Sequence, residues 1–174
     1  LKNQQEGTLT IGWTGSHSPM KYLYPLEPVL QELARQFTFR FVVISNRPPE
    51  MQLPDLHYIP WSQAREVADL REMHIGIMPL PDDPWAQGKC GFKALQYLSL
   101  GIPALVSPVG VNTEIVRHGE NGFHCASDED WVQYLSQMLQ DADMRRRMGA
   151  AGRKTVEDHY SVEANTENFL GLFE

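Results

Sequence analysis

Short apolar runs alternate with stretches of helical periodicity over the first two thirds of the chain. Runs of apolar, β-prone residues that end at turn residues predict four or five strands, with candidates at residues 8–13, 39–44, 56–60, 75–79 and 104–107. Some of these runs are apolar at successive positions, which is typical of parallel strands buried on both faces. Because predicted helices separate the runs, the pattern indicates an α/β fold, a Rossmann-like open parallel sheet with helices on both faces.

The predicted helices differ in regularity. The first begins at Ser18 and Pro19, which suit an N-cap and a first helical position. Pro25 and Pro28 lie inside the same stretch and predict an irregular first turn. Two further helices are expected between strands, at residues 63–71 and 92–100. After residue 126 the pattern predicts a helical C-terminal tail, with helices at residues 128–140, at 142–158 and from about 162.

The chain is interpreted as a short linker followed by one domain. Residues 1–7 lack the charged segment and apolar core of a signal peptide and predict a linker. Residues 8–174 predict a single domain, since domains usually have about 100 to 200 residues. The chain has no initiator methionine and its first strand begins at once, so we expect a piece of a longer protein.

Composition and charge exclude several classes of protein. Hydrophobic residues make up 42% and charged residues 21% of the 174 residues, which is typical of a globular domain. No run approaches the roughly 18 apolar residues of a membrane span. A net charge of −7 disfavours binding to nucleic acid. Cys90 and Cys125 lack the companions of a zinc site, and we expect no metal and a reducing cytoplasm.

One glycine-containing loop follows the first predicted strand. Residues 12–16 lie between this strand and a helix, where free N–H groups can hold a phosphate, so Gly15 and Ser16 are candidate ligand contacts. The loop is not a Gly-x-Gly-x-x-Gly motif, and by itself it is interpreted as a plain tight turn rather than a phosphate site.

The most informative segment is residues 79–93, a loop rich in Pro, Asp and Gly that enters a helix through Gly88-Lys89-Cys90-Gly91. The two glycines allow close approach of a ligand to the backbone, and the helix start presents unpaired N–H groups. Lys89 and Lys93 add positive charge where it opposes the helix dipole unless an anion is present. This chemistry predicts a diphosphate site, and the alternative is a solvated lysine pair.

Two other features leave alternatives open. Residues 107–114 follow the next predicted strand and either contact the same ligand or form a turn with a helix cap. Trp61 and Trp85 border predicted ligand-edge loops and either line the cleft or pack in the core or at the rim. The run from Arg145 to Arg147 is interpreted as a solvated helix face rather than a lipid-binding patch.

Several motifs in order resemble the carboxy-terminal half of glycosyltransferase family 4, the glycosyl transferases group 1. They are the segments Ile-Gly-Ile-Met-Pro-Leu-Pro at 75–81, Gly-Lys-Cys-Gly-Phe-Lys at 88–93, Gln-Tyr at 96–97, Gly-Ile-Pro at 101–103 and Ser-Pro-Val-Gly-Val-Asn at 107–112. The resemblance extends from about Thr8 to Tyr160. It implies one half of a GT-B enzyme, in which two Rossmann-like domains face each other across a cleft and the second binds the nucleotide-sugar donor.

The resemblance also implies roles for single residues. Lys89 and Lys93 fall where positive groups balance the charge of the leaving diphosphate, and are the candidate catalytic residues. The first acid of the family's Glu-x7-Glu element, near the transferred sugar, falls on Gly88, and the second, near the donor ribose, falls on Gln96. Both carboxylates are therefore missing here. Gln96 can still hydrogen-bond a ribose hydroxyl through its amide, and sugar recognition is expected from Asp82, Asp83 or the partner domain. The remaining candidate donor-binding residues are Gly15, Ser16, Lys21, Cys90, Gly91, Phe92, Val109, Gly110, Val111 and Asn112.

The activity implied by the resemblance is transfer of a sugar from a nucleotide diphosphate to a hydroxyl acceptor, with retained configuration and without a bound metal or other cofactor. The nucleotide sugar is then a substrate, and an N-terminal acceptor domain is a missing partner. We expect this domain to bind the nucleotide but to be inactive alone, and to approach a membrane only through the parent chain. The alternative is a catalytically degenerate module with a regulatory or scaffolding role.

Overall fold

One parallel sheet organises the protein. The computed structural model describes Gln4 and residues 7–173. Within these residues, six strands pair in the order β3-β2-β1-β4-β5-β6, and every pairing is parallel. The strands are β1 (Thr10–Thr14), β2 (Arg40–Ser45), β3 (Leu56–Pro60), β4 (Ile75–Met78), β5 (Ala104–Val106) and β6 (Gly122–His124). The predicted Rossmann-like fold is therefore confirmed.

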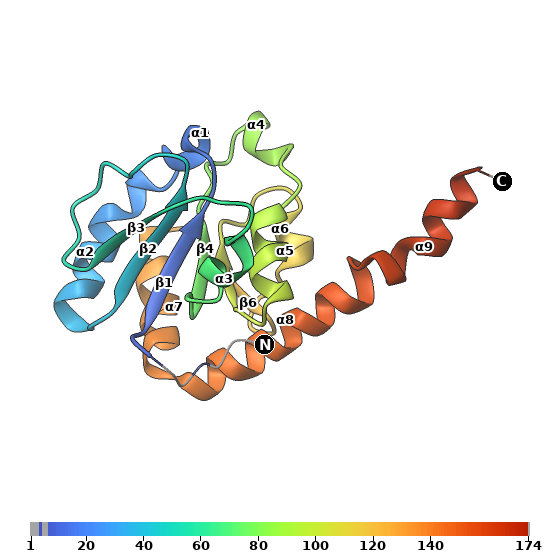
Figure 1. Cartoon of the computed structure of the whole chain (residues 1–174). Coiled ribbons are helices and arrows are strands. Elements are labelled where there is room, and N and C mark those ends of the chain that lie inside the picture. Colours follow the sequence, from blue (N-terminus) through green and yellow to red (C-terminus); the bar gives the residue numbers. More distant parts are fainter. Residues whose placement is uncertain (1–3, 5–6, 174) are drawn as a thin grey trace.

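Helices cover both faces of this sheet (Figure 1). A first hydrophobic core lies between the sheet and the helices α2 (Glu27–Gln36) and α7 (Asp128–Gln140). A second core lies on the opposite face, beneath α3 (Glu66–Leu70), α5 (Phe92–Ser99) and α6 (Asn112–Ile115). The short helices are α1 (His17–Met20), the 3-10 turn η1 (Tyr24–Leu26) and α4 (Pro84–Gln87). Successive residues of β2 and β4 enter opposite cores, which explains their unbroken apolar runs.

The structure departs from the predicted elements at several places, among them the short helix α4 within the segment 79–93 that was expected to be a loop. The stretch expected as one helix with an irregular start is divided into α1, η1 and α2, and both η1 and α2 begin with a proline in the first two positions. Proline suits a helix start but cannot donate inside a helix, which accounts for the division. Strand β6 was not predicted, because it lacks the unbroken apolar run that marks the equally short β5 and ends in the partly exposed His124.

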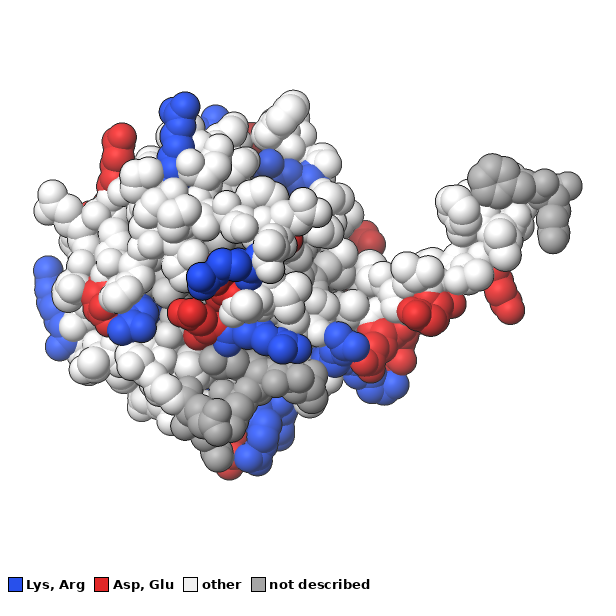
Figure 2. All heavy atoms as spheres, viewed as in Figure 1, with Lys and Arg blue, Asp and Glu red and all other residues white. Residues whose placement is uncertain are grey.

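A helical arm closes the chain. Helix α8 (Ala142–His159) packs on α5, and α9 (Val162–Leu170) with the 3-10 turn η2 (Gly171–Phe173) extends away from the sheet (Figure 1). On the face drawn in Figure 2, Lys and Arg are interspersed with Asp and Glu and do not form one continuous patch. None of the described helices combines the length and the apolar character needed to cross a membrane.

One charged residue of α8 was misjudged. Arg145 is buried rather than solvated, and its guanidinium donates to the carbonyl oxygens of Met138 and Gln4. Gln4 is also buried and accepts from Arg145 Nε through its side chain at 3.3 Å. Of the predicted linker, residues 1–3 and 5–6 lie outside the described residues, while Gln4 is bound to the tail helix.

The strand order places a crevice at one edge of the sheet. From β1 the chain proceeds outward through β2 and β3, and from β4 it proceeds in the opposite direction through β5 and β6. The connections therefore diverge between β1 and β4. In open parallel sheets, ligands bind beyond the carboxyl ends of the strands at such a point. The loops after β1 and β4, together with helix α5, carry most of the predicted site residues.

Candidate functional site

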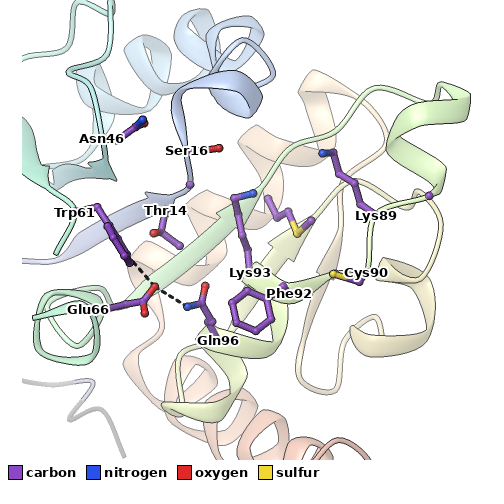
Figure 3. A pocket seen from close by; sticks show the side chains of 14 residues that line it. Thr14, Ser16, Asn46, Trp61, Glu66, Lys89, Cys90, Phe92, Lys93 and Gln96 are labelled. Atoms are coloured by element: carbon purple, nitrogen blue, oxygen red, sulfur yellow. Dashed lines mark hydrogen bonds between the residues drawn. The ribbon is translucent and has the colours of Figure 1, made fainter. Parts of the chain in front are cut away.

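A pocket of about 700 Å³ opens at this point of the sheet (Figure 3). Its walls come from the ends of β1 and β4, the loops after β2 and β3, and the start of α5. The lining residues are Thr14, Gly15, Ser16, Asn46, Trp61, Glu66, Met78, Gly88, Lys89, Cys90, Gly91, Phe92, Lys93 and Gln96. The pocket thus brings together nine of the fourteen residues predicted for the site and adds five others, of which Trp61 had been considered as a cleft residue.

The loop after β1 makes room for a lysine. Gly15 donates its N–H to the Ile44 carbonyl at 3.0 Å, which holds the loop against β2. A Cβ on Gly15 would lie 2.7 Å from both Lys93 Cε and the Trp13 ring. The buried Trp13 ring therefore favours glycine at this position, and the flexible Lys93 stem passes beside it. The Lys93 ammonium lies 5.5 Å from the centroid of the buried Trp13 ring.

The start of α5 is built to present backbone N–H groups. Gly91 is the N-cap with φ +66°, and a Cβ there would lie 2.3 Å from Ile115 Cδ1, so glycine meets both a conformational and a steric requirement. The first N–H groups of a helix have no partner within it, and no side chain caps those of α5. Gly91, Phe92 and Lys93 line the pocket, so the positive end of the helix dipole faces it.

Positive side chains surround this helix start. Burial first, and then the positive charge of Lys89, lower the pKa of the Lys93 ammonium to about 8. Lys89 extends over the ring of Tyr22 at 5.7 Å and over that of Trp85 at 5.9 Å. Lys21 does not line the pocket, but its ammonium lies 5.1 Å from the same Tyr22 ring. Lys89 and Lys93 repel each other, and an anion bound between them would reduce this repulsion and stabilise both charges.

The opposite wall of the pocket holds a carboxylate that sequence reasoning missed. Glu66 accepts hydrogen bonds through Oε1 from Gln96 Nε2 at 3.0 Å and from Trp61 Nε1 at 3.1 Å (Figure 3). Trp61 lines the pocket, which decides one of the open alternatives, whereas Trp85 is 75% exposed and does not. Glu66 precedes Gln96 by thirty residues, and no local motif connects the two positions.

Four predicted donor-binding residues lie behind the pocket wall. Val109 and Asn112 are buried, and Asn112 donates its Nδ2 to the Ser107 carbonyl at 3.2 Å. A Cβ on Gly110 would lie 2.6 Å from the Gln87 carbonyl oxygen, so this turn packs against the loop before α5. Val111 borders Gly91, where a Cβ would lie 3.2 Å from its Cγ2. This segment supports the α5 start from below, and direct donor contact by it stays a prediction.

The two aspartates expected to recognise the sugar, Asp82 and Asp83, form hydrogen bonds within the loop after β4. Asp83 caps α4 by accepting from Ala86 N at 2.7 Å, and Asp82 accepts from Gln87 Nε2 at 2.7 Å. Neither lines the pocket. Among the described residues, no group of three or more His, Cys, Asp or Glu side chains could hold a metal ion.

The chain resembles known glycosyltransferases in sequence. Residues 77–155 match the model of the family Glycosyl transferases group 1. N-acetyl-alpha-D-glucosaminyl L-malate synthase of Bacillus anthracis is 29% identical over 85 residues, which cover 48% of this chain and 22% of that protein. The matched segment contains the loop after β4, helix α5 and most of α8. The predicted resemblance to this family is confirmed.

Solved structures share the fold at low identity. TarM of S. aureus, solved as a G117R mutant with fondaparinux, alpha-GlcNAc-glycerol and UDP, superposes with a TM-score of 0.76 at 12% identity, covering 100% of this chain and 36% of that chain. The C-terminal domain of the glycosyl transferase group 1 family protein LpcC from Francisella tularensis gives 0.70 at 16% identity, with coverage of 88% and 87%. The present chain therefore spans only part of the length of full relatives and has the fold of their C-terminal domains.

Proposed function

We propose that this chain, which matches glycosyl transferases group 1 over residues 77–155, is the donor-binding domain of a retaining, metal-independent glycosyltransferase. Its pocket binds a nucleotide-diphosphate sugar, and an N-terminal domain binds the hydroxyl acceptor. The observation that carries this proposal is the α5 start, where uncapped N–H groups and two lysines converge on one pocket at the carboxyl end of a parallel sheet.

The diphosphate is the ligand that fits this end of the pocket. Free N–H groups at a helix start bind anions, and the dipole places about half a positive charge there. Lys93 and Lys89 supply full positive charges from the same helix start and the preceding loop. An anion close to Lys93 would offset the burial and repulsion that lower its pKa. The unliganded site is thus electrostatically unfavourable by itself, as expected of a preorganised anion site.

The same groups suit the chemistry of glycosyl transfer. When the bond between the anomeric carbon and the distal phosphate oxygen breaks, the electron pair stays with the diphosphate and its negative charge grows. The acceptor oxygen forms the new bond to that carbon and passes its proton to an oxygen of the departing diphosphate. Lys89, Lys93 and the α5 N–H groups stabilise the departing charge without rearrangement, because they are held in place before reaction. Two lysines and a helix start replace a metal cation in this proposal.

Calorimetric titration with UDP, GDP and ADP tests the proposal. We expect one of these nucleotides to bind selectively, and Lys89→Ala and Lys93→Ala each to weaken it about tenfold or more, as loss of a charge-assisted hydrogen bond implies. Lys154→Ala is the matched control, because the Lys154 side chain is exposed on α8 and pairs with Asp158. Absence of binding by the wild-type domain and by the full-length protein would refute the proposal.

A second candidate function is supported by Gly88. Where the family has an acid near the transferred sugar, this chain has no side chain, and the space beside Gly88 is open except for loop carbonyls of Pro84 and Trp85 at 3.6 Å or more. The missing acid at Gly88 supports the alternative of a catalytically degenerate module that binds the nucleotide without transferring a sugar. Sugar transfer by the full-length protein from the selected donor distinguishes the two, since a degenerate module binds nucleotide but transfers no sugar.

A further inference from the structure

Lys93 places an unpaired amine on the wall of the pocket. Among the described residues, neither Lys93 nor Lys89 forms an ion pair with a carboxylate. The half-buried side chain of Lys93 extends from α5 to the loop after β1, where a Cβ on Gly15 would lie 2.7 Å from its Cε. Its nitrogen lies 5.5 Å from the centroid of the buried Trp13 ring (Figure 3). Packing therefore holds this amine in the pocket without a carboxylate to neutralise it.

The surroundings of Lys93 favour its neutral form. Burial is the larger cause and the charge of Lys89 the second, and they lower the pKa of Lys93 to about 8, while Cys90 acts more weakly in the opposite direction. At pH 7.5 about one quarter of such an amine is neutral, compared with about 0.1% of a lysine whose pKa is 10.5. Desolvation and a neighbouring cation are two means by which enzymes activate a lysine as a nucleophile.

The same pocket attracts reagents that carry negative charge. Lys89 lines it beside the uncapped N–H groups of α5. Its carboxylate, Glu66, is already engaged by Gln96 and Trp61 through Oε1. A reagent that matches both the cationic end and the neutral amine has an electrophilic carbon directly next to an anionic group. An acyl phosphate has this structure, because a single oxygen separates its carbonyl carbon from the phosphorus.

We propose that Lys93 is an acylation site and that its acyl donor is an acyl phosphate. The phosphate lies against Lys89 and the α5 start, and the neutral nitrogen of Lys93 attacks the carbonyl carbon. A carbon–nitrogen bond forms, and the bond between the carbonyl carbon and the phosphate oxygen breaks. The electron pair of that bond leaves with the phosphate, which also takes up the proton lost by the nitrogen. The products are an amide at Lys93 and inorganic phosphate.

Acylation should close the pocket to the nucleotide. It replaces one of the two cations by a neutral amide, and it adds an acyl group beside Gly15 and Trp13, where space is already limited. The affinity for the nucleoside diphosphate should then fall about tenfold or more, as for Lys93→Ala. This consequence rests on the proposed function, whereas the reaction at Lys93 does not depend on nucleotide binding.

Non-specific acylation of surface lysines predicts a different order of reaction. The Lys154 side chain is 74% exposed, and Lys21 is exposed as well. The hydrogen bond and ion pair with Asp158 raise the pKa of Lys154 and keep it protonated. If exposure alone determined the rate, Lys21 and Lys154 would react before Lys93. If the pocket activates the amine, the half-buried Lys93 reacts first.

The test is to incubate the domain with acetyl phosphate at pH 7.5 and to follow each lysine by mass spectrometry, after digestion with a protease that cleaves at acidic residues. We expect Lys93 to be acetylated at least about tenfold faster than Lys154. The rate at Lys93 should saturate with acetyl phosphate, and inorganic phosphate should slow it. Lys89→Ala should also slow it, because the variant loses both a contact to the phosphate and the repulsion that favours the neutral amine.

Lys93→Arg is the matched control for the effect on binding. A guanidinium keeps the positive charge and does not become a neutral amine in this pH range. Calorimetry should show that treatment with acetyl phosphate weakens nucleotide binding by the wild-type domain about tenfold or more and leaves that of Lys93→Arg unchanged. Loss of affinity in both proteins would assign the effect to another site and overturn the predicted consequence.

The remaining outcomes separate this inference from the proposed function. If Lys93 reacts no faster than Lys154, or reacts without saturation and without protection by phosphate, the inference is overturned, and a domain that binds a nucleoside diphosphate still supports the proposed function. If Lys93 reacts as expected but neither the domain nor the full-length protein binds any nucleoside diphosphate, the proposed function fails. The acylation site then stands, and only its predicted effect on the nucleotide is lost.

Discussion

The titration of Lys93 gives a direct test of the diphosphate site. Its pKa of about 8, set first by burial and then by the charge of Lys89, lies within the range of ordinary buffers. About nine tenths of this ammonium is protonated at pH 7 and about one tenth at pH 9. If only the protonated form attracts the diphosphate, raising the pH from 7 to 9 should weaken binding about tenfold.

Binding should also take up a proton. A bound anion stabilises the ammonium and raises its pKa, so at pH 8 the protein should gain up to about half a proton per nucleotide. Calorimetry in buffers that differ in ionisation enthalpy measures this number. The terminal phosphate of the ligand, with a pKa of about 6, is already ionised throughout this pH range and contributes little.

Lys93→Arg is the matched control, because a guanidinium stays protonated in this range. The variant keeps Lys89 and Cys90, the other groups whose charge acts on Lys93. We expect its affinity to be nearly constant between pH 7 and 9. If wild type and variant weaken in parallel, or if no proton is taken up, the placement of the diphosphate beside Lys93 is wrong.

The same pKa predicts a cost in stability. Between pH 8 and 10.5 the unfolded chain binds more protons at this lysine than the folded chain does, so the free energy of unfolding should rise with pH across this window. Lowering a lysine pKa from 10.5 to about 8 corresponds to at most about 3 kcal/mol. Lys93→Met should therefore melt higher than wild type at pH 7 while losing nucleotide binding.

Three further predictions concern the frame around the site, and each is measured by chemical denaturation. Tyr97→Phe should lower the free energy of unfolding by about 1 to 3 kcal/mol, because the buried Tyr97 hydroxyl accepts from Thr14 N at 3.1 Å; a loss below 0.5 kcal/mol would show that this N–H finds another partner. Gly149→Ala should cost about 1 to 3 kcal/mol, since a Cβ there would lie 2.1 Å from the Gly101 carbonyl oxygen, and unchanged stability would mean that α8 shifts freely. Arg145→Ala should cost about 3 to 5 kcal/mol through loss of its buried hydrogen bonds, and a surface-like effect would contradict its burial.

The sheet could largely be predicted from the sequence because its central strands are buried on both faces. A run such as Ile75–Met78 is apolar at every position for that reason, and neighbouring turns marked its ends. Strand β6 has only three residues, and one of them, His124, is partly exposed, so its pairing with β5 is a tertiary effect. The burial of Arg145 could not be predicted either, because its partners are main-chain carbonyl groups, which every residue has.

The sequence predicted one end of the pocket, at the start of α5, but not the other end, at Glu66. The α5 start is a local structure, in which Gly88, Gly91 and the two lysines lie within six residues, and it was predicted. The carboxylate of Glu66 reaches the pocket only because the connection from β3 to β4 crosses back over β2 and β1. No spacing in the sequence shows that the chain crosses back over these strands. The sequence showed only Gln96, from which the carboxylate at this position was judged to be missing.

The charges along α5 give the proposed site a direction. At the helix start, backbone N–H groups and Lys93 form a region that favours an anion, and one turn later Gln96 with Glu66 forms a region that accepts hydrogen bonds. A nucleoside diphosphate satisfies both regions in only one orientation, because its phosphates are repelled by the carboxylate. In the proposed function, the transferred sugar is then directed toward Gly88, which lines the pocket. This orientation predicts that nucleotide identity is read by this domain, while recognition of the sugar depends on groups that approach from the acceptor side.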